Sequence, residues 1–377
     1  MTPPASKSAV KIDLDPEPLV QKTLLRFLTC GSVDDGKSTL IGSLLFGAGA
    51  LFQDQLDTLA ADSKKSGTQG DNLDFALLLD GLTAEREQGI TIDVAYRYFS
   101  SSVRQFIVAD TPGHEQYTRN MISGASTADV AIILMDARKG MLTQTLRHTY
   151  LVSLIGIRHV VLAVNKMDLI DYSESRFRQL EEEYRTFAEP LGITSISCIP
   201  MSALESQNIV AASERMPWYV GPALLQYLDA VDLETDRLAD KSFRLPVQWV
   251  NRPNADFRGY SGMVMSGSQR AGDPVRIQPS GQTTRIAEIF TPGLTTGIAV
   301  AGQSVTVTLV DDIDVSRGDL LSTVDAAANV ADQFEVTMIW MNEQPMLRGR
   351  SYLLKIGART VTATIGSIKH KINVNTL

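Results

Sequence analysis

The stretch CGSVDDGKSTL, residues 30–40, decides the fold of the first half of the chain. It contains the spacing GxxxxGK[ST] at residues 31–38, after the apolar run LLRFLTC and before the helical pattern STLIGSLLF. A strand, a glycine-rich loop and a helix in this order predict a phosphate-binding loop, because loop N–H groups and the helix N-terminus point at one anion. The predicted nucleotide-binding residues of this loop are Gly31, Ser32, Val33, Asp34, Asp35, Gly36, Lys37, Ser38 and Thr39.

Two side chains of the loop carry its chemistry. The Lys37 ammonium is expected to neutralise phosphate charge, and the Ser38 hydroxyl is expected to bind Mg²⁺. The adjacent acids Asp34 and Asp35 are unexpected in a loop that binds an anion. We predict that their side chains point away from the phosphates.

Apolar runs rich in β-branched residues alternate with helical patterns along the first 233 residues. The runs occupy residues 24–30, 105–110, 130–136 and 159–166, and residues 173–191 have a clear helical pattern. Continuous apolar strands that alternate with helices predict an α/β fold with a mostly parallel, doubly wound sheet. We assign residues 23–233 to a GTP-binding domain of the phosphate-loop type, preceded by a flexible leader at residues 1–22.

The pattern changes near residue 241, and we interpret the polar residues 234–242 as a linker. Short alternating strands punctuated by glycine then follow, which predicts a β-barrel over residues 241–325. A further change precedes more strands at residues 326–377, and we interpret these as the start of a second barrel.

Three short motifs identify the base and the metal. DTPGH, residues 110–114, places Asp110 near Mg²⁺ and the Gly113 N–H near the γ-phosphate. NKMD supplies Asn165, Lys166 and Asp168, whose carboxylate matches the two donors on the guanine edge. SAL supplies Ser202, Ala203 and Leu204, whose backbone is expected to meet guanine O6. Each motif alone is also compatible with a capped turn, but their order after successive strands favours GTP.

Composition narrows the remaining classes. The chain has 377 residues, a net charge of −8 and two cysteines without metal-ligand spacing. It has no apolar run long enough to span a membrane, and its first twenty residues are broken by proline and charge. We therefore expect a cytoplasmic protein with no membrane partner. The acidic balance also argues against a nucleic-acid partner.

With these motifs in place, the chain resembles the translation-factor class of GTPases over essentially its full length. EREQGITID, residues 85–93, is similar to the first switch of that class. The resemblance implies that Thr91 binds Mg²⁺ together with Ser38 and Asp110, and that His114 orients the attacking water. It thus makes His114, Lys37 and Thr91 the catalytic residues.

Details within the class favour one branch. Elongation factors of the Tu type usually carry GHVDHGK, whereas this chain has GSVDDGK at residues 31–37. That variant, residues 62–99 and the segment IKHKINVNTL resemble the GTPase subunits of bacterial sulfate adenylyltransferase. The resemblance implies GTP and Mg²⁺ as cofactors. It also implies a smaller catalytic subunit, which binds ATP and sulfate, as the partner.

Two alternatives stay open at this point. One is an elongation-factor GTPase that delivers aminoacyl-tRNA, and the other is a regulatory GTP-binding module without metabolic output. The sequence contains one phosphate loop and no SGGxDS-like loop for ATP, so we expect the chemistry of sulfate to reside in the partner. Members of the resembled family continue beyond INVNTL, and we expect the third domain to be incomplete here.

Overall fold

The computed structural model describes residues 22–66, 73–78, 91–233, 238, 240–291 and 294–374. The chain forms two compact units that divide between Ala230 and Val231. The predicted leader lies outside the described residues except for Lys22. Residues 85–90 of the predicted switch and residues 234–237 of the predicted linker also lie outside them.

The first unit is built on a six-stranded sheet with the order β2-β3-β1-β4-β5-β6. Strands β1, β3, β4, β5 and β6 are parallel, and β2 is antiparallel to β3. The strands are β1 (Thr23–Cys30), β2 (Ala95–Ser100), β3 (Arg104–Asp110), β4 (Val130–Asp136), β5 (His159–Asn165) and β6 (Ser195–Pro200). Strand β4 is buried at every position, as expected of a central strand covered on both faces. This architecture confirms the predicted α/β class.

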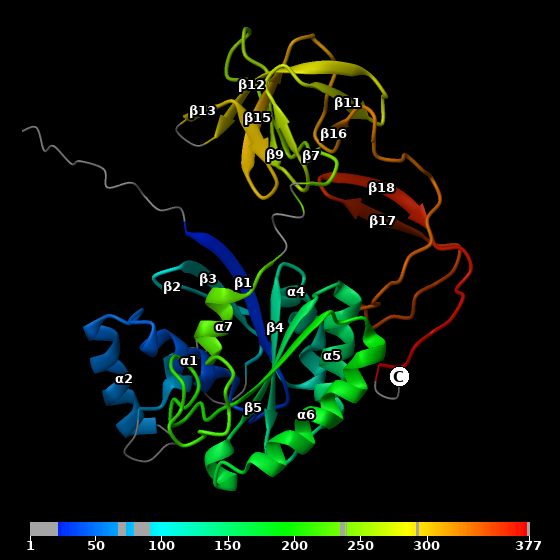
Figure 1. Ribbon diagram of the computed structural model, residues 1–377. Coiled ribbons are helices and arrows are strands. Elements are labelled where there is room, and N and C mark those ends of the chain that lie inside the picture. The colour runs from blue at the N-terminus through cyan, green and yellow to red at the C-terminus, as the bar shows by residue number, and fades with distance from the viewer. Residues whose placement is uncertain are drawn as a thin grey trace, which may run out of the picture. The chain divides into compact units, whose positions relative to one another are not determined.

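Helices cover both faces of this sheet (Figure 1), with α4, α5 and α6 on one face and α1 and α7 on the other. The α-helices are α1 (Lys37–Gly47), α2 (Gln53–Ser66), α4 (Thr118–Ala125), α5 (Thr143–Ile155), α6 (Glu174–Ala188) and α7 (Leu224–Ala230). Short 3₁₀ turns are η1 (Phe75–Leu78), η2 (Glu115–Tyr117), η3 (Met167–Ile170) and η4 (Glu189–Leu191). None of the helices within the described ranges is both long and apolar enough to cross a membrane.

The strand order positions the site. Strand β1 lies between β3 and β4, so consecutive connections leave it toward opposite sides of the sheet. Ligands of open α/β sheets bind at such a switch point, outside the carboxyl ends of the strands. Because five strands are parallel, the segments after β1, β3, β4, β5 and β6 all begin at this edge.

The second unit contains the predicted β-barrel. Its main sheet follows the order β7-β16-β11-β12-β15-β9-β8, with β13 paired to β12, and β10 pairs with β14. An isolated bridge between Arg244 and Ser266 connects β7 to the segment just after β9 and so closes the sheet. The strands are β7 (Arg244–Pro246), β8 (Trp249–Asn251), β9 (Gly259–Met263), β10 (Ser268–Arg270), β11 (Pro274–Gln278), β12 (Thr283–Thr291), β13 (Leu294–Thr296), β14 (Ile298–Val300), β15 (Ser304–Leu309) and β16 (Leu320–Thr323). Phe243, Tyr260, Ile277, Ile289 and Leu321 are among its buried core.

The C-terminal segment forms an antiparallel hairpin of β17 (Ser351–Ile356) and β18 (Arg359–Thr364). Large apolar side chains around it are exposed, including Phe334, Val336 and Leu353. Within the described residues, this hairpin is the strand structure found where the start of a second barrel was predicted.

Candidate functional site: a guanine-nucleotide site

The phosphate loop joins β1 to α1 and leaves the first N–H groups of that helix free of side-chain caps. The N-cap of α1 is Gly36, whose left-handed backbone (φ 93°) excludes most side chains, and no side chain caps the helix. A Cβ on Gly36 would lie 2.5 Å from Asn165 Nδ2. Uncapped N–H groups at a helix start form an anion site, so this geometry fits a phosphate.

Asp34 and Asp35 have different surroundings. Asp34 is exposed, whereas Asp35 is only 1% exposed and its Oδ2 accepts a hydrogen bond of 2.6 Å from Ser32 N. Burial raises the pKa of Asp35, although the Lys37 charge and the Ser32 hydrogen bond act in the opposite direction. Asp35 therefore stabilises the loop conformation through a buried hydrogen bond within the loop. Sequence reasoning missed this role; the available signal was an acid three residues after Ser32, the spacing at which an acid in a capping box reaches back to a backbone N–H.

The Lys37 ammonium is enclosed by the loop. Its Nζ donates to Ser32 O over 2.8 Å, and the residue is only 7% exposed. Burial lowers the pKa of Lys37, while Asp110 and Asp35 oppose this shift. A buried ammonium is expensive unless anions surround it, so this arrangement fits a phosphate ligand.

Ser38 and Asp110 come together as predicted for a Mg²⁺ site. Ser38 Oγ donates to Asp110 Oδ2 over 3.1 Å, and Thr29 Oγ1 donates to Asp110 Oδ1 over 3.1 Å. A hydroxyl and one carboxylate are the hard oxygen ligands that Mg²⁺ uses beside phosphates. Thr91 is half-buried, and no hydrogen bond among the described residues joins it to Ser38 or Asp110.

His114 follows Gly113 in a segment that lies on the phosphate loop. A Cβ on Gly113 would be 2.5 Å from Lys37 Nζ and 2.8 Å from Gly31 O, so only glycine fits there. His114 caps η2, and its Nδ1 accepts from Gln116 N over 3.3 Å. In the neutral ring, this hydrogen bond assigns the proton to Nε2.

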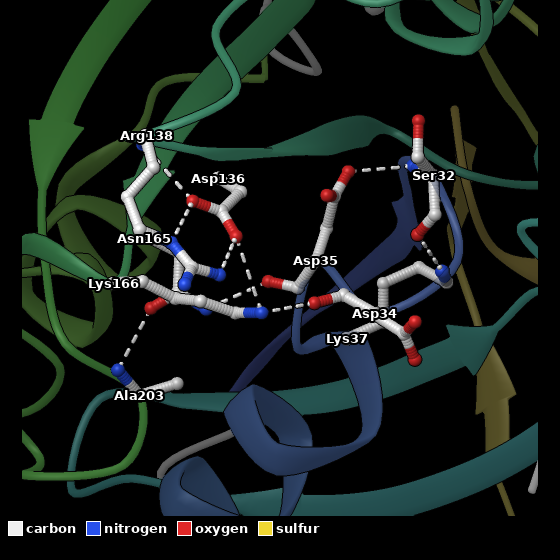
Figure 2. Close-up of polar contacts among 9 residues, drawn as sticks. All are labelled: Ser32, Asp34, Asp35, Lys37, Asp136, Arg138, Asn165, Lys166 and Ala203. Atoms are coloured by element: carbon white, nitrogen blue, oxygen red, sulfur yellow. Dashed lines mark hydrogen bonds and ion pairs between the residues drawn. The ribbon is translucent and has the colours of Figure 1, made fainter. Parts of the chain in front are cut away.

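Asn165 connects three loops (Figure 2). It is 2% exposed at the end of β5, and its Nδ2 donates to Asp35 O over 2.8 Å. Its Oδ1 accepts from Ala203 N over 2.9 Å. The NKMD and SAL motifs and the phosphate loop are therefore fixed to one amide side chain.

Lys166, the residue after Asn165, forms an ion pair with Asp136 (Figure 2). Lys166 Nζ lies 3.3 Å from Asp136 Oδ2 and also donates to Asp34 O. Arg138 binds Asp136 through its backbone N, Nε and Nη2. Burial alone would raise the pKa of Asp136, but the hydrogen bonds from Arg138 and the charge of Lys166 lower it to about 2. Sequence reasoning missed Asp136 and Arg138, although an acid at the end of an apolar strand was a signal.

Asp168 has an acceptor ready for a ligand. Its Oδ1 is buried and has no hydrogen-bond partner within the described ranges. A buried carboxylate oxygen needs donors, and the guanine edge offers N–H groups of that kind.

In the SAL motif, Ser202 and Ala203 are buried and Leu204 is 40% exposed. The Ala203 carbonyl accepts from Ser43 Oγ over 2.8 Å, which attaches this loop to α1.

Comparison with known proteins places the chain in a class. Residues 22–241 match the family described as Elongation factor Tu GTP binding domain, and residues 333–377 match GTP-eEF1A C-terminal domain-like. The fold is similar to that of the S. cerevisiae Ski7 GTPase-like domain, with a TM-score of 0.52 and 19% identity over 80% of this chain and 75% of that chain. The site and the fold thus define a GTP-binding domain of the translation-factor class.

Curated relatives narrow the family. The chain is 56% identical to "Sulfate adenylyltransferase subunit 1" of Bacteroides thetaiotaomicron, over 99% of this chain and 76% of the relative. It is also 56% identical to "Bifunctional enzyme CysN/CysC" of Xylella fastidiosa, over 94% of this chain and 57% of that enzyme. The chain belongs to the sulfate adenylyltransferase subunit 1 family. It spans little more than half the length of the bifunctional relative.

Proposed function

We propose that this chain hydrolyses GTP and thereby drives a partner subunit to form adenylyl sulfate and pyrophosphate from ATP and sulfate. The observation that carries the nucleotide assignment is that Asn165 joins the phosphate loop at Asp35 to Ala203, while the Oδ1 of Asp168, three residues further on, is buried without a hydrogen-bond partner among the described residues. Family membership supports the metabolic role. A cytoplasmic location is part of the same proposal.

Base and phosphates would bind at opposite sides of Asn165. The Asp168 carboxylate accepts from the guanine edge, the Ala203 backbone faces O6, and Lys166 borders the base. The uncapped start of α1 and Lys37 hold the phosphates. Ser38, Asp110 and Thr91 are the residues that would hold Mg²⁺, which supplies positive charge to the phosphate oxygens.

Hydrolysis would depend on positioning and electrostatics. Lys37 stabilises the charge that develops on the transferred phosphoryl group, and His114 orients the attacking water. The close approach of Gly113 to Lys37 Nζ supports this division, since it places the histidine segment beside the phosphate loop.

The partner would carry the sulfate chemistry. Formation of the phosphosulfate anhydride from ATP is strongly uphill, so GTP hydrolysis would supply the missing free energy. Coupling requires that switch residues contact the partner differently in the two nucleotide states. The name "subunit 1" of the relatives supports the existence of a further subunit. The elongation-factor alternative is less supported, because the close relatives named above are sulfate adenylyltransferase proteins.

The test is the plateau of adenylyl sulfate made by the complex of this chain with its partner, without pyrophosphatase. We expect GTP to carry the product beyond the equilibrium of the ATP reaction, in proportion to the GTP consumed. A non-hydrolysable GTP analogue should only speed the approach to that equilibrium. Identical plateaus would refute the energetic role and leave GTP as an activator.

A further inference from the structure

Helix α5 contacts both sequence neighbours of His114, namely Gly113 and Glu115. Gln144 Nε2 donates to the Gly113 carbonyl over 3.3 Å. Arg147 Nη2 binds Glu115 Oε2 over 3.2 Å. Gln144 and Arg147 are three positions apart and so project from the same side of the helix. The residues immediately before and after His114 are therefore attached to one rigid element.

The ion pair is anchored on the helix rather than on the loop. The Arg147 side chain is 6% exposed, whereas that of Glu115 is 64% exposed. Helix α5 is attached to α6 by a hydrogen bond between Thr149 Oγ1 and Tyr184 OH. A buried guanidinium on a packed helix has little freedom, so Glu115 takes the position that Arg147 dictates.

His114 depends on this backbone for its direction. Its ring Nδ1 accepts a hydrogen bond from Gln116 N, within the same short turn. The orientation of the imidazole thus follows the backbone of residues 113–117. On the other side, a Cβ added at Gly113 would lie 2.5 Å from Lys37 Nζ, so the backbone here runs close to the phosphate loop. The segment lies between the phosphate loop and α5.

From this arrangement we infer that Arg147, assisted by Gln144, is a positioning residue for His114 in GTP hydrolysis. The inference rests on the proposed role of His114. Arg147 acts through Glu115 and does not touch the reacting atoms. Displacement of a catalytic group by about 1 Å can lower a rate by about 100-fold, so loss of the tether should slow the chemical step.

The experiment measures single-turnover GTP hydrolysis by the full chain, together with the Kd values for GTP and GDP. Arg147→Met and Glu115→Gln should each lower the hydrolysis rate constant by roughly tenfold, in line with a modest displacement of His114. Both Kd values should stay within about twofold, because the tether acts on the transition state. Arg147→Lys, which keeps the charge, should retain part of the activity.

The matched control is Arg178→Met on α6, where Arg178 pairs with Glu174 and Glu181 at the surface. It should hydrolyse GTP at the wild-type rate. Glu115→Gln protects the test against misfolding, because Glu115 is mostly exposed and its loss leaves the helix packing intact.

A double-mutant cycle separates this inference from the proposed role of His114. In a His114→Ala background, Arg147→Met should have no further effect, since a positioning residue needs the group that it positions. Additive losses, or normal hydrolysis by Glu115→Gln and Arg147→Met beside a slow His114→Ala, would overturn the inference alone. Wild-type hydrolysis by His114→Ala would overturn the proposed catalytic role, and the inference with it.

Discussion

Asn165 Nδ2 and the backbone carbonyl of Asp35 are joined by a 2.8 Å hydrogen bond, although the two residues are 130 positions apart in sequence. The bond connects the end of β5 to the phosphate loop, and the same amide binds Ala203 through its oxygen. The phosphate loop and the SAL motif are therefore attached to one buried side chain of the NKMD motif.

Asn165→Ala should weaken GTP and GDP binding alike, by about 10- to 100-fold, because it removes two buried hydrogen bonds worth about 1 kcal/mol each or more. Isothermal titration with both nucleotides checks this. The control is Asn208→Ala, which removes another buried amide, bonded to Pro200 O and Ser213 N. That variant should lose stability without a comparable loss of affinity. Wild-type nucleotide affinity in Asn165→Ala would contradict the inference that Asn165 supports nucleotide binding through these two hydrogen bonds.

Asp168→Asn should shift base preference from GTP toward XTP. The amide offers a donor where the carboxylate offers only acceptors, and mismatched buried polar groups discriminate by about 2 kcal/mol or more. Competition binding with GTP and XTP measures the shift. Asp171→Asn, an exposed position in the same loop, should leave the preference unchanged. If Asp168→Asn still prefers GTP tenfold, the guanine assignment is wrong.

His114→Ala should reduce GTP hydrolysis by about 100-fold with nearly unchanged nucleotide affinity, since orientation of water matters only on the way to the transition state. Lys37→Ala should instead weaken nucleotide binding, because we expect the buried ammonium to contact the phosphates in the bound ground state as well as in the transition state. Single-turnover rates and Kd values distinguish the two effects. An equal loss of affinity in both variants would argue against separate roles.

His148 should make the fold sensitive to acid. The ring is 0% exposed on α5, and neither ring nitrogen has a hydrogen-bond partner in the described part of the chain. Burial, with smaller effects of Lys37 and Arg147, lowers the pKa of His148 from 6.5 to about 3. The unfolded chain therefore binds a proton at this residue where the folded chain does not, so its contribution to stability falls as the pH drops from about 6.5 toward 3.

Urea unfolding at several pH values tests this dependence. His148→Leu should flatten the pH dependence between pH 6.5 and 4.5, where one such group contributes at most about 1.4 kcal/mol per pH unit. His370→Gln, at an exposed position, is the control and should leave the slope unchanged. An unchanged slope in His148→Leu would show that folded and unfolded chains bind protons equally at this residue, and would contradict the lowered pKa.

The sheet and most of the site could be predicted because their signals are local. VAIILMD reads as a strand buried on both faces, and the structure buries each of its residues. GxxxxGKS, DTPGH, NKMD and SAL fix their own loop conformations, so the structure brings Ser38 to Asp110 and Asn165 to Ala203.

Contacts set by side-chain direction could not be predicted. The pairs Arg147–Glu115 and Lys166–Asp136 join residues about 30 positions apart, and no spacing rule encodes which rotamer reaches which partner. The burial of Asp35 was not predicted either: its carboxylate accepts a hydrogen bond from Ser32 N, a backbone N–H that needs an acceptor. Thr91 follows residues 79–90, which lie outside the described residues, and its metal role stays a prediction.

Lys166 shows how nucleotide recognition can conflict with thermal robustness. Its backbone is left-handed, with φ 63° and ψ 36°, a conformation that is unfavourable by about 1 kcal/mol for a residue with a Cβ. Glycine at this position would relieve that strain but would remove the ammonium that joins Asp136 to the Asp34 carbonyl. A glycine variant would therefore exchange relief of backbone strain for loss of the ion pair with the buried Asp136, and these two effects oppose each other in the free energy of unfolding. A thermostabilised version of this protein should be screened for nucleotide affinity whenever residue 166 is allowed to vary.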